Sequence, residues 1–597
     1  MPAEAGNSAG AGASGLSDPG GRANFAAEYR GGGLVSSLAG ELSRRSGVEL
    51  PAARETTSTG WAACLAVAIV AAAILPRWWL LDRFYLDFDE SMHFQVAKEP
   101  TLWEAYRASR IHTHPPLVFL MYHLWLPMGD SEVMLRIPSF VLGIAGLWAG
   151  YLWLREMTDA WSALAGLCLL AFAVPMIHIA IQMRGYTLWL LFVFGGLYAR
   201  ERAFRAGGAA PLAGAALCLG LAMLTHYATA WILFVLGVVD LARLIGVRPN
   251  RRFVLAWVVC QTLLAALAVW LFVDHASTFR GTNTQWELWA NWMMDVPFKP
   301  GPLFAVKAAI WKCAQFFLFL AGRWWFALLL CVLVGAFAQW QRARRTQGSL
   351  GLAAAQSGLI VLPLLLGMLL FARQIYPLGG TRHSLWLVPW VVLGLAAGVQ
   401  AVAAWSPRRA GPVIAAGLLA WIGDVSVREV VAVQNHDTPQ KLREFAELIR
   451  QTIPPHEPIL TDDCTRNVLD YYLARKTRNH GRELPHGYKE YVFDEYRLTV
   501  LPRFHFYYTN LRRNWPQLAS ALGDHVEQPL WIVYLGYEIP MMKLDLLSQR
   551  LPYGQLLGRH SFPAVGAELL RVRLMPPKLE STETVGQPAA PAIQKGG

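Results

Sequence analysis

Apolar stretches of about 20 residues recur along residues 57–425 of this chain, separated by short polar segments. A bilayer span needs roughly 20 mostly apolar residues, because an α-helix rises about 1.5 Å per residue. Hydrophobic residues make up 54% of the 597-residue sequence and charged residues only 16%. A soluble protein of this size needs more charge on its surface. The sequence therefore predicts a polytopic α-helical membrane protein.

The apolar stretches predict about eleven membrane spans. They lie near residues 61–81, 133–154, 160–179, 186–204, 209–225, 227–245, 252–273, 323–340, 352–372, 384–404 and 411–424. Two further stretches, 115–128 and 302–321, are ambiguous because Pro and His, or Lys, interrupt their apolar character. We expect both to form interfacial helices that do not cross the bilayer.

Short basic runs between the spans predict the orientation. They occupy residues 200–205, 248–252, 341–345 and 406–409. If both ambiguous stretches stay in the interface, all of these runs fall on the cytoplasmic side, as the positive-inside rule expects. Because the runs are short and separated, the formal net charge of +12 indicates membrane lipids as partners and not nucleic acid.

The two ends of the chain differ in character from the spans. Residues 1–56 are rich in Gly, Ala and Ser, which predicts a disordered cytoplasmic tail. Residues 430–575 mix helical periodicity with short apolar runs such as PLWIVYLG, which predicts a small extracytoplasmic α/β domain. Within it, Asp462 and Asp463 are expected to begin a helix. Residues 576–597 are expected to be a Pro-rich disordered tail.

Two adjacent acids, Asp89 and Glu90, stand in the outer loop 82–131 directly after the first span. A partly desolvated carboxylate at the mouth of a membrane cavity can take a proton from an attacking hydroxyl. The alternative is a solvated loop, since acids and bases are both frequent in residues 82–112. Paired acids can also hold a divalent cation, which is the one cofactor that the sequence leaves open. The seven Cys show no metal-ligand spacing.

Other polar residues gather on the same predicted face. His114 precedes two prolines suited to a helix start. Arg184 and Arg382 lie at the ends of spans, where an arginine can bind a phosphate through two parallel hydrogen bonds or simply reach the lipid headgroups. Tyr186 could stack on a sugar ring or belong to the aromatic belt of the membrane.

The order of these motifs resembles a known superfamily. Four elements in this order are similar to the protein O-mannosyltransferase and aminoarabinose transferase superfamily: the acid pair at 89–90, HPPL at 114–117, GDSEVMLRIPS at 129–139 and R-x-Y at 184–186. These are membrane glycosyltransferases of the C-type fold that use lipid-phosphate-linked sugars. The resemblance is best over residues 61–200.

The resemblance implies a role for each candidate residue. Asp89 would be the general base, and Glu90 would support it or help hold the polar end of the donor. His114 would line the active site. Arg184 and Tyr186 would contact the donor phosphate or the sugar. Arg382 matches a basic residue that opens a late span, where the family often has Arg-Tyr and this chain has His383 after the arginine.

The sequence thus predicts a glycosyltransferase of the inner (plasma) membrane. It would move a sugar from a polyprenyl-phosphate donor to a hydroxyl of a lipid, glycan or protein acceptor on the extracytoplasmic side. The alternatives are a transporter or lipid flippase, and a catalytically silent scaffold of the same fold. A transporter should show charges or broken helices near the middle of its spans, whereas the spans here are mostly apolar.

Overall fold

A computed structural model describes most of the chain between residues 58 and 576. The described residues are 58–110, 112, 114–247, 249–277, 296, 300–347, 350–434, 439–475, 481–493, 495–502, 511–535 and 554–576. The predicted tails, residues 1–56 and 576–597, lie outside them except for Pro576. The predicted class, a polytopic helical membrane protein with a small C-terminal α/β domain, is confirmed.

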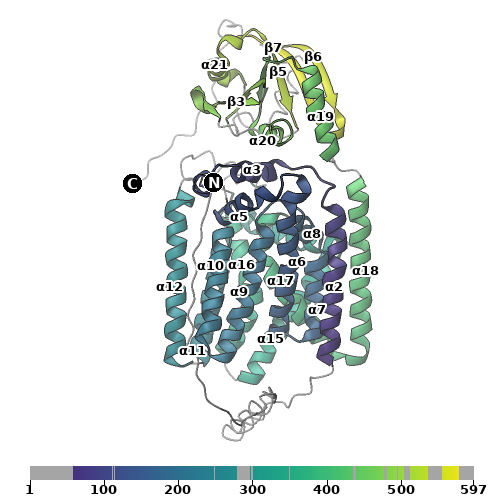
Figure 1. Ribbon diagram of the computed structural model, residues 1–597. Helices are drawn as coiled ribbons and strands as arrows, with labels where there is room; N and C mark the ends of the chain where they lie inside the picture. Colours follow the sequence, from purple (N-terminus) through teal and green to yellow (C-terminus); the bar gives the residue numbers. More distant parts are fainter. Residues whose placement is uncertain are drawn as a thin grey trace, which may run out of the picture. The chain divides into compact units, whose positions relative to one another are not determined.

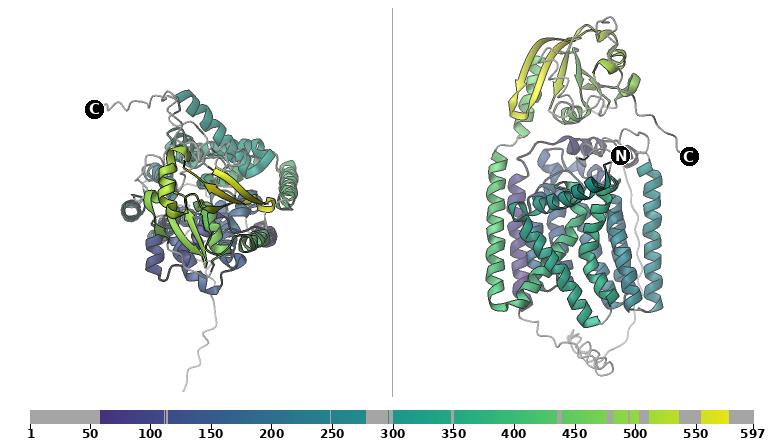
Figure 2. Two further views of the ribbon diagram at one scale, coloured as in Figure 1. Left: turned by 90° about the horizontal axis from the view of Figure 1, so that it is seen from above. Right: turned by 180° about the vertical axis from the view of Figure 1, so that it is seen from behind.

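The membrane part is a bundle of helices that run side by side in both side views (Figure 1, Figure 2). Its helices are α2 (Ser58–Leu80), α6 (Glu132–Met157), α7 (Ala160–Phe172), α8 (Val174–Ala180), α9 (Tyr186–Ala206), α10 (Ala209–Thr225), α11 (Thr229–Val247), α12 (Arg251–Asp274), α14 (Pro302–Ala321), α15 (Trp325–Gln347), α16 (Leu350–Ala372), α17 (Val388–Trp405) and α18 (Pro407–Gln434). Each predicted span falls on one of these helices or on the bent pair α7 and α8.

Length and hydropathy give a smaller count of spans. Among the described residues, eight helical segments are long and apolar enough to cross a membrane, or nine if α7 and α8, bent by 60°, form one span. Helix α10 misses this test because it has only 17 residues, and α9 carries four charged residues near its end. The count of about eleven therefore stays a prediction.

The two ambiguous stretches both form helices. Helix α5 (Leu117–Trp125) has nine residues, about 14 Å of helix, which is too short to cross a bilayer and agrees with an interfacial position. Residues 302–345 form a 44-residue apolar stretch. The chain turns within it at Gly322, where φ is 58°, so α14 and α15 are separate helices. The interfacial position of α14 stays a prediction.

The acid pair lies in a helix and not in a solvated loop. Helix α3 (Phe88–Ala97) begins with a capping box, in which Asp87 accepts from the Glu90 N–H at 2.8 Å and Glu90 accepts from the Asp87 N–H at 3.2 Å. This reciprocal pair satisfies two backbone donors at the helix start. Helix α4 (Leu102–Ser109) follows, capped by Thr101. The capping box fixes Asp89 in the first turn of α3.

The C-terminal part contains a seven-stranded mixed sheet. Its elements are α19 (Pro439–Thr452), β1 (Pro458–Thr461), α20 (Asp463–Tyr472), β2 (Arg482–Glu483), β3 (Lys489–Phe493), β4 (Tyr496–Val500), α21 (Leu511–Leu522), β5 (Pro529–Tyr534), β6 (Gly554–Phe562) and β7 (Ala567–Leu574). The strand order is β2-β3-β4-β1-β5-β7-β6, with β1 parallel to both neighbours.

Strand β1 shows why this sheet has two apolar cores. All four of its residues are buried. Ile459 packs in one core with residues of α19 and α20, while Leu460 packs in the other with residues of α21. Alternate side chains of a strand point to opposite faces, so a continuously apolar strand indicates helices on both faces.

Helix α20 packs directly on α3. The Phe94 and Tyr471 rings meet edge to face with centroids 5.0 Å apart. Lys98 forms an ion pair of 3.3 Å with Asp470. The C-terminal part thus contacts the helix that carries Asp89.

Candidate active site

Glu90 is the buried anchor of the acid pair. Its side chain accepts two parallel hydrogen bonds from Arg136, Nε to Oε1 at 2.9 Å and Nη2 to Oε2 at 2.8 Å. The Met183 N–H donates to the same carboxylate at 2.7 Å. Both Glu90 and Arg136 are almost fully buried. A buried charge is tolerated when it is paired and hydrogen-bonded in this way. Glu90 therefore ties α3 to α6 and to the segment before α9.

Asp89 faces a different set of partners. Arg184 Nη2 lies 2.6 Å from Asp89 Oδ2 and 3.0 Å from both carboxylate oxygens of Asp87. Arg382 donates to the same Oδ2 of Asp89, although the two residues are 293 positions apart in the sequence. Asp89 keeps 21% of its side chain exposed and Arg382 36%, whereas Arg184 is buried. Two arginines from distant segments thus meet at one carboxylate.

These arginines determine the protonation state of Asp89. Partial burial acts to raise the pKa of the carboxyl, but the positive charges of Arg184 and Arg382 outweigh burial and hold the pKa well below its usual range. Asp89 is therefore ionised in this arrangement and is a weak base while both arginines hold it.

Arg184 also has donor capacity that the protein does not use. Its Nε and Nη1 groups are buried, and neither finds a hydrogen-bond partner among the described residues. A buried guanidinium donor without an acceptor is unfavourable, so an anionic ligand next to Asp89 would satisfy it. The phosphate contact of Arg184 stays a prediction.

A group of histidine and tyrosine rings adjoins the carboxylate. His93 Nδ1 donates to the backbone carbonyl of Asp89 at 2.7 Å. The His93 ring lies 5.5 Å from His114, which lies 6.1 Å from Tyr186 and 5.6 Å from His226, measured between centroids. The structure therefore brings the predicted residues His114 and Tyr186 beside Asp89.

Burial keeps these imidazoles neutral. Burial lowers the pKa of His93 to about 4, with Arg184 acting in the same direction. Burial lowers the pKa of His226 to about 3, and the pKa of His114 falls well below its usual value for the same reason. Because His93 Nδ1 donates to a carbonyl, the Nε2 atom of the neutral ring is an acceptor, and it finds no partner among the described residues.

Sequence reasoning missed several residues of this site. Asp87 had a visible signal, because Asp and Glu three residues apart form the pattern of a capping box. His93 follows Asp89 by four residues and so shares its face of α3. Arg136 stood inside the quoted motif without an assigned partner. His226 had no distinctive pattern, since its place beside Tyr186 depends on the packing of α9 and α10.

The carboxylates do not form a cation site as they are arranged. Asp87 and Asp89 both face Arg184, and Glu90 is engaged by Arg136. In the part of the chain that the structure describes, no three His, Cys, Asp or Glu side chains gather as metal ligands. A divalent cation would have to displace a guanidinium, so we derive no step through a metal.

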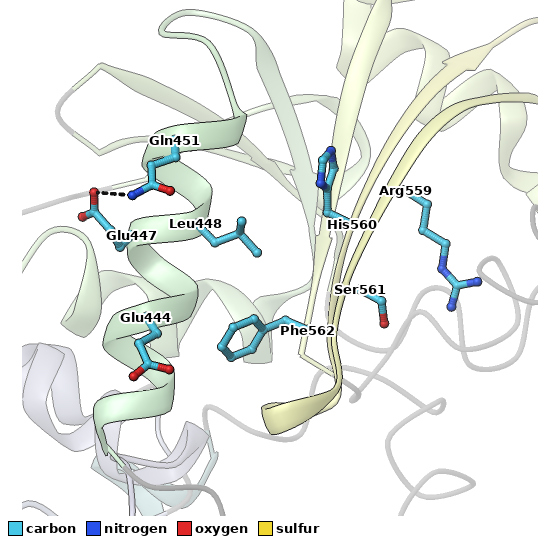
Figure 3. A pocket seen from close by; sticks show the side chains of 8 residues that line it. All are labelled: Glu444, Glu447, Leu448, Gln451, Arg559, His560, Ser561 and Phe562. Atoms are coloured by element: carbon cyan, nitrogen blue, oxygen red, sulfur yellow. Dashed lines mark hydrogen bonds between the residues drawn. The ribbon is translucent and has the colours of Figure 1, made fainter.

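A further hollow lies elsewhere, in the C-terminal part of the chain. Figure 3 shows it between α19 and β6, with a volume of about 670 Å³. Its lining residues are Glu444, Glu447, Leu448, Gln451, Arg559, His560, Ser561 and Phe562. It is therefore separate from Asp89. A second hollow of about 370 Å³ opens between α14 and the segment before Arg382, where Lys312, Phe319 and Gly379 belong to its lining.

Comparisons with known proteins return structures and no sequence match. No protein-family model matches the chain, and no curated protein matches it. Among solved structures, ArnT from Cupriavidus metallidurans in the apo state is similar, with 14% identity, coverage of 86% of this chain and 98% of ArnT, and a TM-score of 0.46. The same protein bound to undecaprenyl phosphate gives 16%, the same coverage and a TM-score of 0.45. The Archaeoglobus fulgidus oligosaccharyltransferase in the apo form gives 11%, coverage of 79% and 69%, and 0.41. At these values the likeness assigns no role to any individual residue of this chain.

Proposed function

We propose that this chain is a membrane glycosyltransferase that transfers a sugar from a polyprenyl-phosphate donor to an acceptor hydroxyl. The observation that carries the proposal is the convergence of Arg184 and Arg382 on Asp89, with buried donors of Arg184 left over. In this arrangement the carboxylate can accept a proton, and the two guanidinium groups can bind a phosphate. The ordered sequence motifs support the same class of reaction.

Binding of the donor would free the Asp89 carboxylate from the two arginines. The donor phosphate competes with Asp89 for Arg184 and Arg382, because a guanidinium binds phosphate through parallel hydrogen bonds. As the phosphate takes over these donors, the Asp89 carboxylate loses its two strongest partners and its pKa rises toward the ordinary value. A stronger base then stands next to the bound donor.

The chemical step follows from this arrangement. Asp89 accepts the proton of the acceptor hydroxyl while that oxygen attacks the anomeric carbon. The bond between the anomeric carbon and the phosphate oxygen breaks, and the polyprenyl phosphate leaves with the bonding electrons. Arg184 and Arg382 stabilise the negative charge that develops on this oxygen. A single displacement inverts the anomeric centre.

Glu90 acts as a positioning residue in this scheme. Its carboxylate is occupied by Arg136 and the Met183 N–H, and so it has no role at the reacting atoms. It fixes the first turn of α3 and therefore the place of Asp89. His114 and Tyr186 would form the wall of the site next to the sugar.

The lipid chain of the donor requires an apolar path that ends near Arg382. The hollow beside α14 contains Leu318 and Phe319 and also the cationic Lys312. An apolar groove with a basic residue near the headgroup level suits a lipid phosphate. By the charge argument, this face of the bundle is extracytoplasmic.

The transporter alternative finds less support in the spans. The break between α7 and α8 resembles the discontinuous helices of transporters, but Arg77 donates to the carbonyls of Ala171 at 2.7 Å and Leu170 at 3.3 Å. These carbonyls at the break are therefore already satisfied. The buried charges of α9 are also paired, Arg200 with Asp240 and Glu201 with Arg243.

The test uses the full-length protein in nanodiscs with a panel of polyprenyl-phosphate sugars and a cell extract as a source of acceptors. The readout is free polyprenyl phosphate. We expect the wild type to release it from one preferred donor and Asp89→Asn to release none. Equal release by both proteins, or no release from any donor, would contradict the proposed transfer reaction and favour the transporter alternative.

A further inference from the structure

A polar cleft lies beside the contact between α3 and the C-terminal part of the chain. Its volume is about 330 Å³, within the range of roughly 300–1,000 Å³ that holds small ligands. One wall comes from α3 and from Ala108 and His112, and the other from α20, β3 and the residues that follow β4. The cleft thus adjoins the helix that carries Asp89 without being part of the arginine site.

Two buried donors in the lining lack acceptors. Gln95 Oε1 accepts from Arg466 Nη1 at 2.7 Å, which fixes the amide. Gln95 Nε2 is buried and finds no partner among the described residues, and the same is true of Arg466 Nε. Arg466 is 8% exposed, and its guanidinium carbon lies 4.4 Å from the centre of the Tyr491 ring. Preorganised donors without partners indicate a missing acceptor of hydrogen bonds.

The charges around these donors balance. Three cations, Lys98, Arg466 and Lys489, line the cleft. Each forms an ion pair, with Asp470 at 3.3 Å, Asp463 at 2.8 Å and Glu483 at 2.9 Å respectively. Three carboxylates, Glu99, Asp463 and Asp470, line the cleft as well, so a phosphorylated headgroup would meet no excess of positive charge there. The cleft therefore favours an uncharged ligand.

The remaining lining fits a polyhydroxylated molecule. Asn467 contributes an amide beside the carboxylates, and Met92, Val96 and Leu501 contribute apolar surface. Hydroxyl groups both accept from amide donors and donate to carboxylates, while the C–H faces of a sugar ring pack on apolar side chains. A peptide would instead require unpaired backbone partners or apolar anchor pockets.

We propose that this cleft binds a neutral saccharide, which is the acceptor of the transfer reaction. Only the role of the saccharide as acceptor rests on the proposed function; its binding to the cleft does not. A saccharide held against α3 by Gln95 and Arg466 lies beside the helix that presents Asp89. The acceptor class is thereby narrowed to a glycan.

The experiment measures binding without any donor. Full-length protein in nanodiscs is titrated with fluorescently labelled neutral tri- to pentasaccharides, a phosphorylated saccharide and a Ser/Thr-rich peptide. We expect a neutral saccharide to bind, with affinity lowered roughly tenfold by Gln95→Leu and by Gln95→Glu. Gln440→Leu on the exposed face of α19 is the matched control and should bind like the wild type.

Failure of this inference can be told apart from failure of the proposed function. Asp89→Asn should still bind the saccharide, because binding needs no chemistry. Three outcomes would overturn the inference. The neutral saccharides do not bind, or they bind equally well to the Gln95 variants. In the third, only the peptide or the phosphorylated saccharide binds in a way that depends on Gln95. If the Gln95 variants do not fold, hydrogen exchange of α3 and α20 in the wild type decides: protection by the saccharide supports the site and unchanged exchange refutes it.

Discussion

The guanidinium of Arg136 binds the carboxylate of Glu90 through two parallel hydrogen bonds of 2.9 and 2.8 Å, and both side chains are buried. Arg136 also donates to the backbone carbonyls of Leu81, Phe84 and Tyr85. The pair therefore joins α6, α3 and the end of the first span. It gives the two adjacent acids different tasks, since only Asp89 remains open to a ligand.

Glu90→Gln is expected to destabilise the fold. Removing one member of a buried ion pair leaves the other charge uncompensated and typically costs roughly 3–5 kcal/mol. The thermal unfolding midpoint in detergent should therefore fall clearly. Asp82→Asn is the control, because Asp82 and its partner Arg83 are exposed. An unchanged midpoint for Glu90→Gln would show that the pair contributes nothing to stability.

Asp89→Asn is expected to abolish transfer and keep the fold. Arg184 retains its two contacts with Asp87. Arg382 loses its ion pair, but its side chain is 36% exposed and can be solvated. Loss of a general base lowers the rate by roughly 10²–10⁴-fold. The measurement is polyprenyl phosphate release, with the unfolding midpoint recorded for the same preparations. Activity within a few fold of the wild type would exclude Asp89 as the base.

Arg382→Ala should weaken use of the donor with little effect on folding, because the side chain is 36% exposed. A hydrogen bond to a charged group contributes roughly 1.5–3 kcal/mol, which corresponds to about a 10- to 100-fold rise in the KM for the donor. Arg382→Lys should restore only part of the loss, since an ammonium group cannot form the parallel pair. Full rescue by lysine would indicate a simple point charge.

The C-terminal part should show a pH dependence that comes from Asp462. Burial raises the pKa of this carboxyl to about 6, although hydrogen bonds from Thr465 act to lower it. An unfolded Asp titrates near 3.9, so the folded state binds more protons between about pH 4 and pH 6. The stability that Asp462 contributes is therefore present below about pH 4 and lost as the pH rises through about 6.

The check compares unfolding midpoints at pH 5 and pH 7 for the wild type and Asp462→Asn. Asparagine can still accept the hydrogen bond that caps α20 but does not titrate in this range. The wild type should lose stability relative to the variant on going from pH 5 to pH 7, by roughly 1 kcal/mol. An identical change in both proteins would assign the pH dependence to other groups.

Much of the fold could be predicted because it depends on local patterns. Helix α20 begins at the predicted acids Asp462 and Asp463, and strand β5 covers most of the apolar run PLWIVYLG. The strands β3, β4 and β6 were not predicted. Strand β6 is an edge strand rich in polar residues, and an edge needs no apolar face to form. The helical state of residues 88–97 was missed, although its capping box is visible in the sequence.

The sequence by itself determined the apolar helices of the bundle, their expected orientation and the set of chemically capable residues, because hydropathy and charge act over one helix or one loop. Only the tertiary structure decided which carboxylate is anchored and which is available. Glu90 meets Arg136 and Asp89 meets Arg382 across 46 and 293 positions. Such pairs depend on how the bundle packs α3 against α6 and brings Arg382, which precedes α17, next to α3. No local pattern encodes that packing.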